Sequence, residues 1–310
     1  MIFRCLVCIT VIFLISCSMG DNPDEETEIL SSHYDLVSLP YEELAYHEDR
    51  IVDYETLELT DPSGIRLWRY GNSVEEYYHP VAIAQDCLRA LNAYEKTGEP
   101  RFLYYTSFTA CFMADNAMKI DDTIYFPYDF DFRLHGDPDD LMVAPWYSGM
   151  AQGQWLSVFV RLYYLTGYDR YLDIARKIFN SFNRFGEDIF TVFINDENYY
   201  WISEYPDPLE PNYTLNGFIY GLYGLYDYWW VLSDEASGIL LCAGLHTLRD
   251  HISAFRVPNG CSYYCLKHKV QCTTYHLIHI EQLAYVSEIC GDSFFLEMSD
   301  LFKADHYPDS

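Results

Sequence analysis

A recurring break between apolar, helix-like runs constrains the fold of this chain more than any other feature. The first break reads Thr97-Gly98-Glu99-Pro100-Arg101-Phe102-Leu103, and the same punctuation recurs as Thr166-Gly167-Tyr168-Asp169-Arg170-Tyr171-Leu172. Further breaks follow near Ser233-Asp234-Glu235 and at Cys290-Gly291-Asp292-Ser293. Each break separates two helical runs, so the repeating unit is a helix, a short turn and an antiparallel helix. About four such hairpins predict an all-α fold, an α/α toroid in the form of an incomplete barrel.

Two glycine-rich helices are expected on the inside of the toroid, running from Trp146 to Tyr163 and from Asn212 to Tyr228. Glycines repeat there at helical spacing, as Gly149 and Gly153 and as Gly217, Gly221 and Gly224. Such a face carries no side chains, so another backbone or a ligand can approach it closely. Tight helix packing is the plainer interpretation, and a wall facing a ligand is the functional one.

The loops before these two helices are expected to converge on one mouth of the toroid. An aromatic loop from Phe126 to Phe132 precedes the first helix. Glu204 and Tyr205 precede the second, on a loop that Pro206, Pro208 and Pro211 keep from becoming helical. This arrangement would hold a carboxylate and a phenol against the glycine face.

The amino terminus predicts export. A single Arg4 precedes an apolar run too short to span a bilayer, and Leu14-Ile15-Ser16-Cys17 looks like a lipobox. We expect a lipoprotein signal peptide over 1–16, lipidation of Cys17, an acidic tether over 17–40, an arm or β-hairpin over 41–75 and the toroid over 76–310. An uncleaved anchor or an ordinary cleaved signal are the alternatives. Each predicts export, and lipidation of Cys17 would anchor the protein in the cell envelope, in the periplasm or at the cell surface.

The net charge and the aromatic content limit the classes of molecule that this protein is expected to bind. The formal net charge is −28, which argues against nucleic acid as a partner and requires a local basic cleft for any anionic polymer. Aromatic residues make up 18% of the chain, including 30 tyrosines. This content is typical either of a carbohydrate groove, where rings stack on sugar faces, or of aromatic packing between helices.

Seven cysteines remain after Cys17: Cys87, Cys111, Cys242, Cys261, Cys265, Cys272 and Cys290. An odd number in an exported protein leaves at least one thiol free or paired between chains. Cys261, Cys265, His268 and Cys272 could ligate zinc or form one or two disulfides. His276 and His279 could bind a metal with Cys272, but a substrate-contacting or core role is favoured for each. We therefore assign no metal.

Several strings resemble one enzyme family. They are Glu204-Tyr205-Pro206, Leu215-Asn216-Gly217-Phe218, Met150-Ala151-Gln152-Gly153, His79-Pro80-Val81-Ala82, Tyr264-Cys265-Leu266-Lys267-His268 and Thr274-Tyr275-His276. Together they resemble the C-terminal domain of the D-glucuronyl C5-epimerases, from about His79 to Phe302. These enzymes invert C5 of glucuronic acid in heparan-type polysaccharides. Larger members carry a β domain ahead of the helical one, and family members dimerise. The resemblance thus implies an anionic polysaccharide substrate and a homodimer.

The resemblance also implies residue roles. Glu204 and Tyr275 would form the opposed acid/base pair, with Tyr205 and Tyr264 as essential neighbours. Gln152, Asn216, Lys267, His268 and His276 would contact the substrate. Lys267 stands where the family tends to have arginine, which keeps the charge but loses a bidentate grip on a carboxylate. Tyr263 competes with Tyr264, because counting forward from Gly260 favours Tyr263.

The residues fit this chemistry. Inverting C5 of a uronate needs a base on each face of the sugar and a cation on its carboxylate. Glu204 is a plausible base if burial raises its pKa, and a tyrosine needs nearby cations to lower its pKa. No nucleotide-binding glycine loop, nucleophile elbow or His-Glu-x-x-His string occurs, so proton transfer without an organic cofactor is the simplest chemistry.

Three alternatives stay open. A polysaccharide lyase begins with the same proton abstraction and then expels the group at C4. A glycoside hydrolase would need two carboxylates across a groove, for which Asp129 or Asp131 could face Glu204. A surface lipoprotein that binds glycans without turning them over belongs to another class, and the acidic balance favours it.

Overall fold

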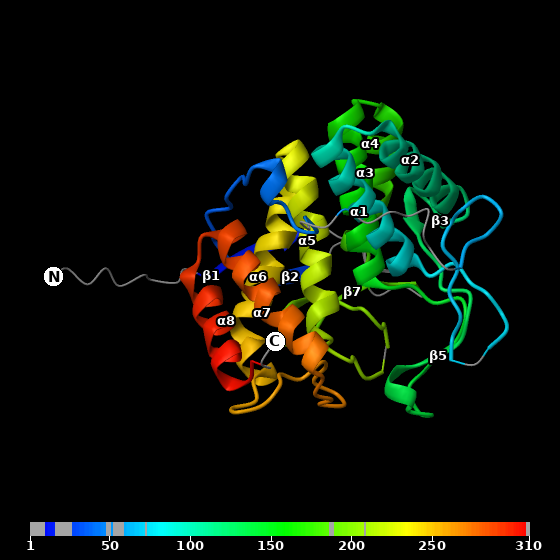
Figure 1. The fold of residues 1–310 in the computed structure, drawn as a ribbon. Helices are drawn as coiled ribbons and strands as arrows, with labels where there is room; N and C mark the ends of the chain where they lie inside the picture. Colours follow the sequence, from blue (N-terminus) through cyan, green and yellow to red (C-terminus); the bar gives the residue numbers. More distant parts are fainter. Residues whose placement is uncertain are drawn as a thin grey trace.

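The computed structural model describes residues 10–15, 27–47, 51, 59–71, 73–185, 189–207 and 209–307. Its core is four antiparallel helical hairpins that follow one another across the molecule (Figure 1). They are α1 (Pro80–Thr97) with α2 (Pro100–Asp115), α3 (Gly149–Thr166) with α4 (Asp169–Phe179), α5 (Leu215–Leu232) with α6 (Glu235–Phe255), and α7 (Thr273–Cys290) with α8 (Ser293–Asp305). This confirms the predicted all-α toroid.

The predicted turns end the helices through backbone geometry. Gly98, Gly167 and Gly291 adopt the left-handed conformation after α1, α3 and α7, with φ of 68°, 68° and 66°. Glycine suits this position because it has no Cβ to clash. Ser233 serves the same purpose after α5 with φ of 51°. Pro100 then begins α2, where its missing N–H costs nothing.

Helices α3 and α5 form the inner wall, and their backbones touch. A Cβ on Gly153 would lie 2.6 Å from Gly221 Cα, and one on Gly224 would lie 2.4 Å from Gly153 O. The packing interpretation of these three glycines is therefore correct. Further along, Arg161 donates from Nε to Asp227 Oδ2 at 2.9 Å and from Nη2 to Oδ1 at 3.1 Å. Both side chains are buried, so this bidentate pair fixes the register of the two helices.

Short antiparallel hairpins decorate the ends of the helices. They are β3 (Met118–Ile120) with β4 (Thr123–Tyr125), β5 (Phe132–Arg133) with β6 (Leu141–Met142), and β7 (Val192–Ile194) with β8 (Tyr200–Ile202). The 3-10 turns η3 (Leu134–Gly136) and η4 (Asn180–Asn183) accompany them. β8 pairs with β7 in the register Val192↔Ile202, which places the loop after Ile202 against the start of α3.

The amino-terminal segment wraps around the helices. β1 (Thr10–Ile15) pairs with β2 (Thr27–Ser32), and β2 contacts α6. Residues 1–9 and 16–26, with Cys17 among them, lie outside the described residues, so the signal peptide and lipidation stay predictions. Residues 29–40 were assigned to a free tether, but they pack on the body: Leu30 N donates to Asn198 O at 2.9 Å and Val37 N to Ile289 O at 2.8 Å. Any free tether is therefore shorter than predicted.

The arm before α1 packs on its own chain. η1 (Tyr41–Glu43) leads to Ala45, whose N–H donates to Tyr285 Oη at 2.9 Å and whose carbonyl accepts from Arg161 at 2.9 Å. Within the expected arm or β-hairpin over 41–75, the chain turns at Asp61-Pro62-Ser63-Gly64, where Gly64 N donates to Asp61 O and a bridge joins Thr60 to Arg66. None of the helices in the described part of the chain has the length and apolar character needed to span a bilayer.

Candidate active site

A cavity of about 340 Å³ lies where the inner helices begin. The loops before α1, α3 and α5 and the first turns of α7 contribute to it, which confirms that the loops before the two predicted inner helices converge on one mouth. Its polar and aromatic lining includes His79, Gln85, Tyr128, Trp146, Ser148, Glu204, Tyr205, Asn216, Tyr220 and Tyr275.

Glu204 lies at the bottom of this cavity, held by its neighbours in sequence. Ser203 N donates to Thr191 O at 2.8 Å, and Ser203 O accepts from Gly149 N at 2.7 Å. The side chain lies against Gly217, where a Cβ would come within 2.3 Å of Glu204 Oε2. Both interpretations of the glycine face of α5 therefore hold in part. Gly221 and Gly224 allow close packing of the chain, and Gly217 makes room for the Glu204 carboxylate.

Burial controls the acidity of Glu204. The residue is 8% exposed, and loss of solvation raises its pKa to about 7, while hydrogen bonds from Tyr205 and Tyr264 lower it in part. The carboxyl is therefore divided between its acid and base forms near neutral pH. A group in this condition can accept and return a proton, as general acid–base chemistry requires.

Three phenols surround the carboxylate. Tyr264 Oη donates to Glu204 Oε2 at 3.2 Å and to Oε1 at 3.3 Å, and Tyr205 Oη lies 3.2 Å from Tyr264 Oη. The Tyr275 ring lies 4.4 Å from the Tyr264 ring, centroid to centroid. The structure thus brings together all four residues of the predicted acid/base set.

Tyr264, not Tyr263, contacts Glu204. Leu215 N donates to Tyr264 O at 3.0 Å and Tyr264 N to Val270 O at 2.8 Å, so the residue is fixed next to the start of α5. Tyr263 pairs with Gln271 instead and packs against the main core. The local geometry decides the alternative that counting from Gly260 left open.

The phenols are protonated rather than activated. Burial, followed by the charge of Glu204, raises the pKa of Tyr205, Tyr264 and Tyr275. The cation expected to lower the pKa of a tyrosine has no counterpart among the described residues of the cavity lining. Among the described residues, neither lysine nor arginine lines the cavity. The phenols can therefore donate protons at neutral pH, and Glu204 is the group able to accept one.

Stacked aromatic side chains form another part of the cavity wall. Trp146 stacks on Tyr128 with ring centroids 3.8 Å apart, and Phe132 stacks on Tyr205 at 5.6 Å. His79 caps α1 by accepting from Ala82 N through Nδ1, and burial lowers its pKa to about 4, so it is neutral. Flat rings beside hydrogen-bonding groups suit the faces of a sugar. The aromatic loop was predicted from the sequence, but the stacking of Trp146 on that loop was not.

Two of the predicted substrate contacts, Gln152 and His276, do not line the cavity. Gln152 accepts from Phe126 N and donates to Ile124 O and Ser181 Oγ, so its amide braces the aromatic loop from behind. His276 shares its Nδ1 with Ser262, and its Nε2 lies 2.7 Å from His306 O, between α7 and α8. Neither lines the cavity, because their polar atoms are used inside the protein. Asn216 does line it, and no described residue bonds to its buried Oδ1.

Lys267 also fails to reach the cavity. Its Nζ lies 2.7 Å from Asp140 Oδ1, 3.3 Å from Glu210 and 3.6 Å from Asp207. Three carboxylates thus hold the ammonium outside the cavity, where Lys267 was predicted to contact the substrate carboxylate. His268 lies behind Tyr264, with Nε2 3.2 Å from Asp140 Oδ2.

The cysteines do not group as predicted. All seven that follow Cys17 are free thiols in the described structure, and Cys261 and Cys272 lie apart from Cys265. His279 Nδ1 lies 2.8 Å from Ser262 Oγ, so it does not face Cys272 as a ligand. Cys265 has two other partners, His135 and His268. His135 was not predicted as a partner, because it is 130 residues away from Cys265 in the sequence.

The hydrolase alternative lacks its second carboxylate. Asp131 Oδ1 accepts from Ala144 N at 2.9 Å, and both Asp129 and Asp131 are exposed. Neither lines the cavity around Glu204. Among the described residues, Glu204 is the one carboxylate there.

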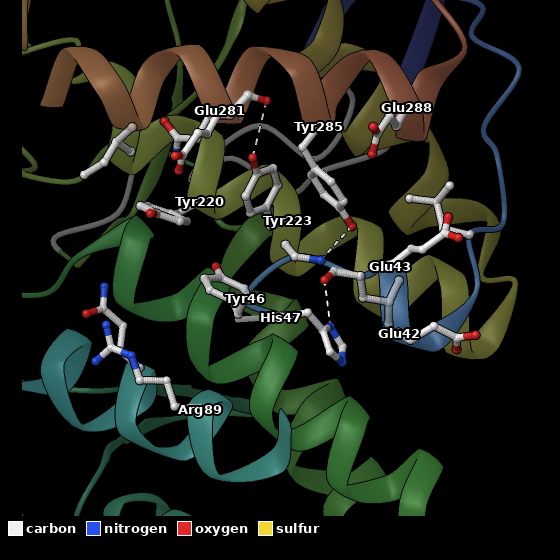
Figure 2. Close-up of a pocket in the computed structure, with 16 residues that line it drawn as sticks. Glu42, Glu43, Tyr46, His47, Arg89, Tyr220, Tyr223, Glu281, Tyr285 and Glu288 are labelled. Carbon is white, nitrogen blue, oxygen red and sulfur yellow. Dashed lines mark hydrogen bonds between the residues drawn. The ribbon is translucent and has the colours of Figure 1, made fainter. Parts of the chain in front are cut away.

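A larger cleft of about 940 Å³ adjoins this cavity and shares Gln85, Tyr220 and Ile278 with it. Figure 2 shows it between α1, α5, α7 and the arm. Tyrosines from α5 and α7 line its wall, and Ala45 closes one end by donating to Tyr285. Its charged rim comprises Glu42, Glu43, Glu281, Glu288 and Arg89.

Fold and site define a class: an α/α toroid whose inner helices begin around one buried carboxylate and three phenols. Residues 120–304 match the model of the D-glucuronyl C5-epimerase C-terminus. The chain therefore belongs to the D-glucuronyl C5-epimerase family. A curated D-glucuronyl C5-epimerase of Caenorhabditis elegans is 28% identical over 182 residues, which cover 52% of this chain and 29% of that relative.

Solved structures resemble the fold. The cellobiose 2-epimerase of Bacillus thermoamylovorans has a TM-score of 0.53 at 13% identity, over 74% of this chain and 60% of that one. The GH76 α-mannanase of Bacteroides thetaiotaomicron has a TM-score of 0.51 at 12% identity, over 75% and 58%. At such identities the likeness concerns the fold alone.

Proposed function

We propose that this protein is a uronic acid C5-epimerase that converts D-glucuronate to L-iduronate in a heparosan-like or heparan-like polysaccharide. The observation that carries the proposal is Glu204, a buried carboxyl with a pKa of about 7 in contact with Tyr264. Membership of the family supports it, because the matched region includes every member of this cluster.

In the proposed mechanism, Glu204 removes the C5 proton and Tyr275 returns one to the opposite face. The assignment follows from acidity: the carboxylate is available near pH 7, whereas burial keeps the Tyr275 phenol protonated. Each turnover leaves Glu204 protonated and Tyr275 deprotonated. Tyr264 bonds to Glu204 and packs on Tyr275, so it can pass the proton back between them.

Neutral donors would stabilise the charge that builds up on the uronate carboxylate. The phenols of Tyr205 and Tyr264 lie in a buried site, where hydrogen bonds to a developing anion are stronger than in water. The unpaired Oδ1 of Asn216 can accept from a sugar hydroxyl. The acidic rim of the adjoining cleft repels a polyanion, so we expect the polymer to avoid that cleft.

A lyase of the same substrate class is the second candidate, because the Glu204 cluster can also begin an elimination. Non-catalytic glycan binding is the third. We further propose export and anchoring through Cys17, and a homodimer. The first two rest on the residues around the lipobox and the last on the family resemblance.

The test is proton NMR of glucuronate-rich heparosan incubated with the protein in deuterated water. We expect the C5 proton signal to disappear and iduronate signals to grow. Tyr264→Phe should prevent sustained iduronate formation, because the proton can no longer pass from Glu204 back to Tyr275, and Tyr263→Phe should keep both changes. An unsaturated uronate absorbing in the ultraviolet would instead identify a lyase. No change with any glucuronate polymer would leave glycan binding.

A further inference from the structure

Behind Tyr264, three side chains from two separate loops meet. Cys265 Sγ lies 3.5 Å from His135 Nε2 and 3.5 Å from His268 Nδ1. All three atoms lie within 4.8 Å of one another. Cys265 is buried and His268 is half-buried, while His135 is the exposed member. None of these atoms belongs to the lining of the Glu204 cavity.

Both sulfur–nitrogen spacings fit a tetrahedral metal. With zinc–sulfur and zinc–nitrogen bonds of about 2.3 and 2.05 Å, the sulfur and each nitrogen should be separated by about 3.6 Å. Both observed sulfur–nitrogen distances agree with this value. One thiolate with two imidazoles is a donor set that zinc prefers, and calcium and magnesium prefer oxygen.

The surroundings complete the pattern. His268 turns Nδ1 to the thiol, and its Nε2 lies 3.2 Å from Asp140 Oδ2, within ion-pairing distance of a carboxylate such as commonly supports a metal-bound histidine. Asp137 lies 3.8 Å from the same Nε2 and adds negative charge. The positive charge of Lys267 would repel a metal cation, but its ammonium pairs with Asp140 Oδ1.

We propose that His135 Nε2, His268 Nδ1 and Cys265 Sγ bind one zinc ion, with water as the fourth ligand. On binding, the Cys265 thiol loses its proton to solvent, and a sulfur–zinc bond replaces the sulfur–hydrogen bond. The ion joins η3 (Leu134–Gly136) to the loop that carries Tyr264. Because the His135 ring also packs on the Tyr264 ring at 5.3 Å, the site fixes the position of that phenol.

The test uses the full chain stripped with a chelator and titrated with Co²⁺, then with Zn²⁺ against a chromophoric chelator. We expect one ion per chain, a thiolate-to-cobalt charge-transfer band, and tetrahedral visible bands that Zn²⁺ abolishes. Cys265→Ser should remove the charge-transfer band and weaken zinc binding at least tenfold. Asp140→Asn should weaken zinc binding by about 10- to 100-fold, as loss of an outer carboxylate does elsewhere.

Cys272→Ser is the matched control, because Cys272 is nearby in sequence and outside the cluster. It should bind cobalt and zinc like the unmodified chain. Loss of binding in this control, or binding without a thiolate band, would overturn the proposal. If Cys265→Ser does not fold, X-ray absorption of the zinc-loaded unmodified chain decides: one sulfur and two imidazoles are expected, and oxygen ligands alone would refute the site.

Discussion

Replacing Glu204 with glutamine should change how stability depends on pH. Burial raises the pKa of Glu204 from 4.5 to about 7. Between these values the folded chain holds a proton that the unfolded chain releases. The resulting stabilisation is fully present below about pH 4.5 and is lost as pH rises through about 7. Its size is about 3 kcal/mol, from about 1.4 kcal/mol for each pKa unit.

Glu204→Gln removes this proton while keeping an acceptor for Tyr264. Relative to the parent, the variant should therefore gain about 3 kcal/mol of unfolding free energy between pH 4.5 and pH 8. Urea unfolding of both proteins across this range measures the difference, in which contributions from other titrating groups cancel. Glu297→Gln, on the exposed face of α8, should show no such trend. A difference between Glu204→Gln and parent that is constant with pH would refute the burial of a neutral carboxyl.

Three further outcomes follow from the same geometry. Gly217→Ala should lower epimerase activity by about 100-fold, because the added Cβ displaces the Glu204 carboxyl. The control Gly238→Ala in α6 should retain activity, and equal losses in the two variants would contradict the role of Gly217. Arg161→Met should cost about 3–5 kcal/mol by leaving a buried carboxylate unpaired, and a shift below 1 kcal/mol in urea unfolding would argue against this ion pair. C5 exchange on glucuronate should rise with pH through about 7 as Glu204 ionises, and a falling profile would exclude it as the base.

Much of the fold could be predicted because its signals are local. A left-handed glycine after α1 and a proline at the start of α2 mark a turn within a few residues, and a left-handed glycine recurs after α3 and α7. The contact of Glu204 with Gly217 could also be predicted, since the helical spacing of the glycines indicated a face without side chains. These features depend on neighbours in sequence.

The errors concern polar groups whose partners lie far away in sequence. Gln152 and His276 stand in motifs that resemble the family, but their side chains form hydrogen bonds with Ser181 and His306 inside the protein. Lys267 keeps a positive charge near Tyr264, yet Asp140 holds it outside the cavity. A string of residues shows which side chains are present, and tertiary packing decides which of their atoms are free.

The most direct test of the central claim follows deuterium at C5 with Glu204 and Tyr275 changed one at a time. On heparosan in deuterated water, Tyr275→Phe should exchange C5 of glucuronate without forming iduronate, because Glu204 still removes and returns the proton on one face. Glu204→Gln should show neither exchange nor iduronate. Iduronate formation by Tyr275→Phe, or exchange by Glu204→Gln, would contradict the two opposed roles.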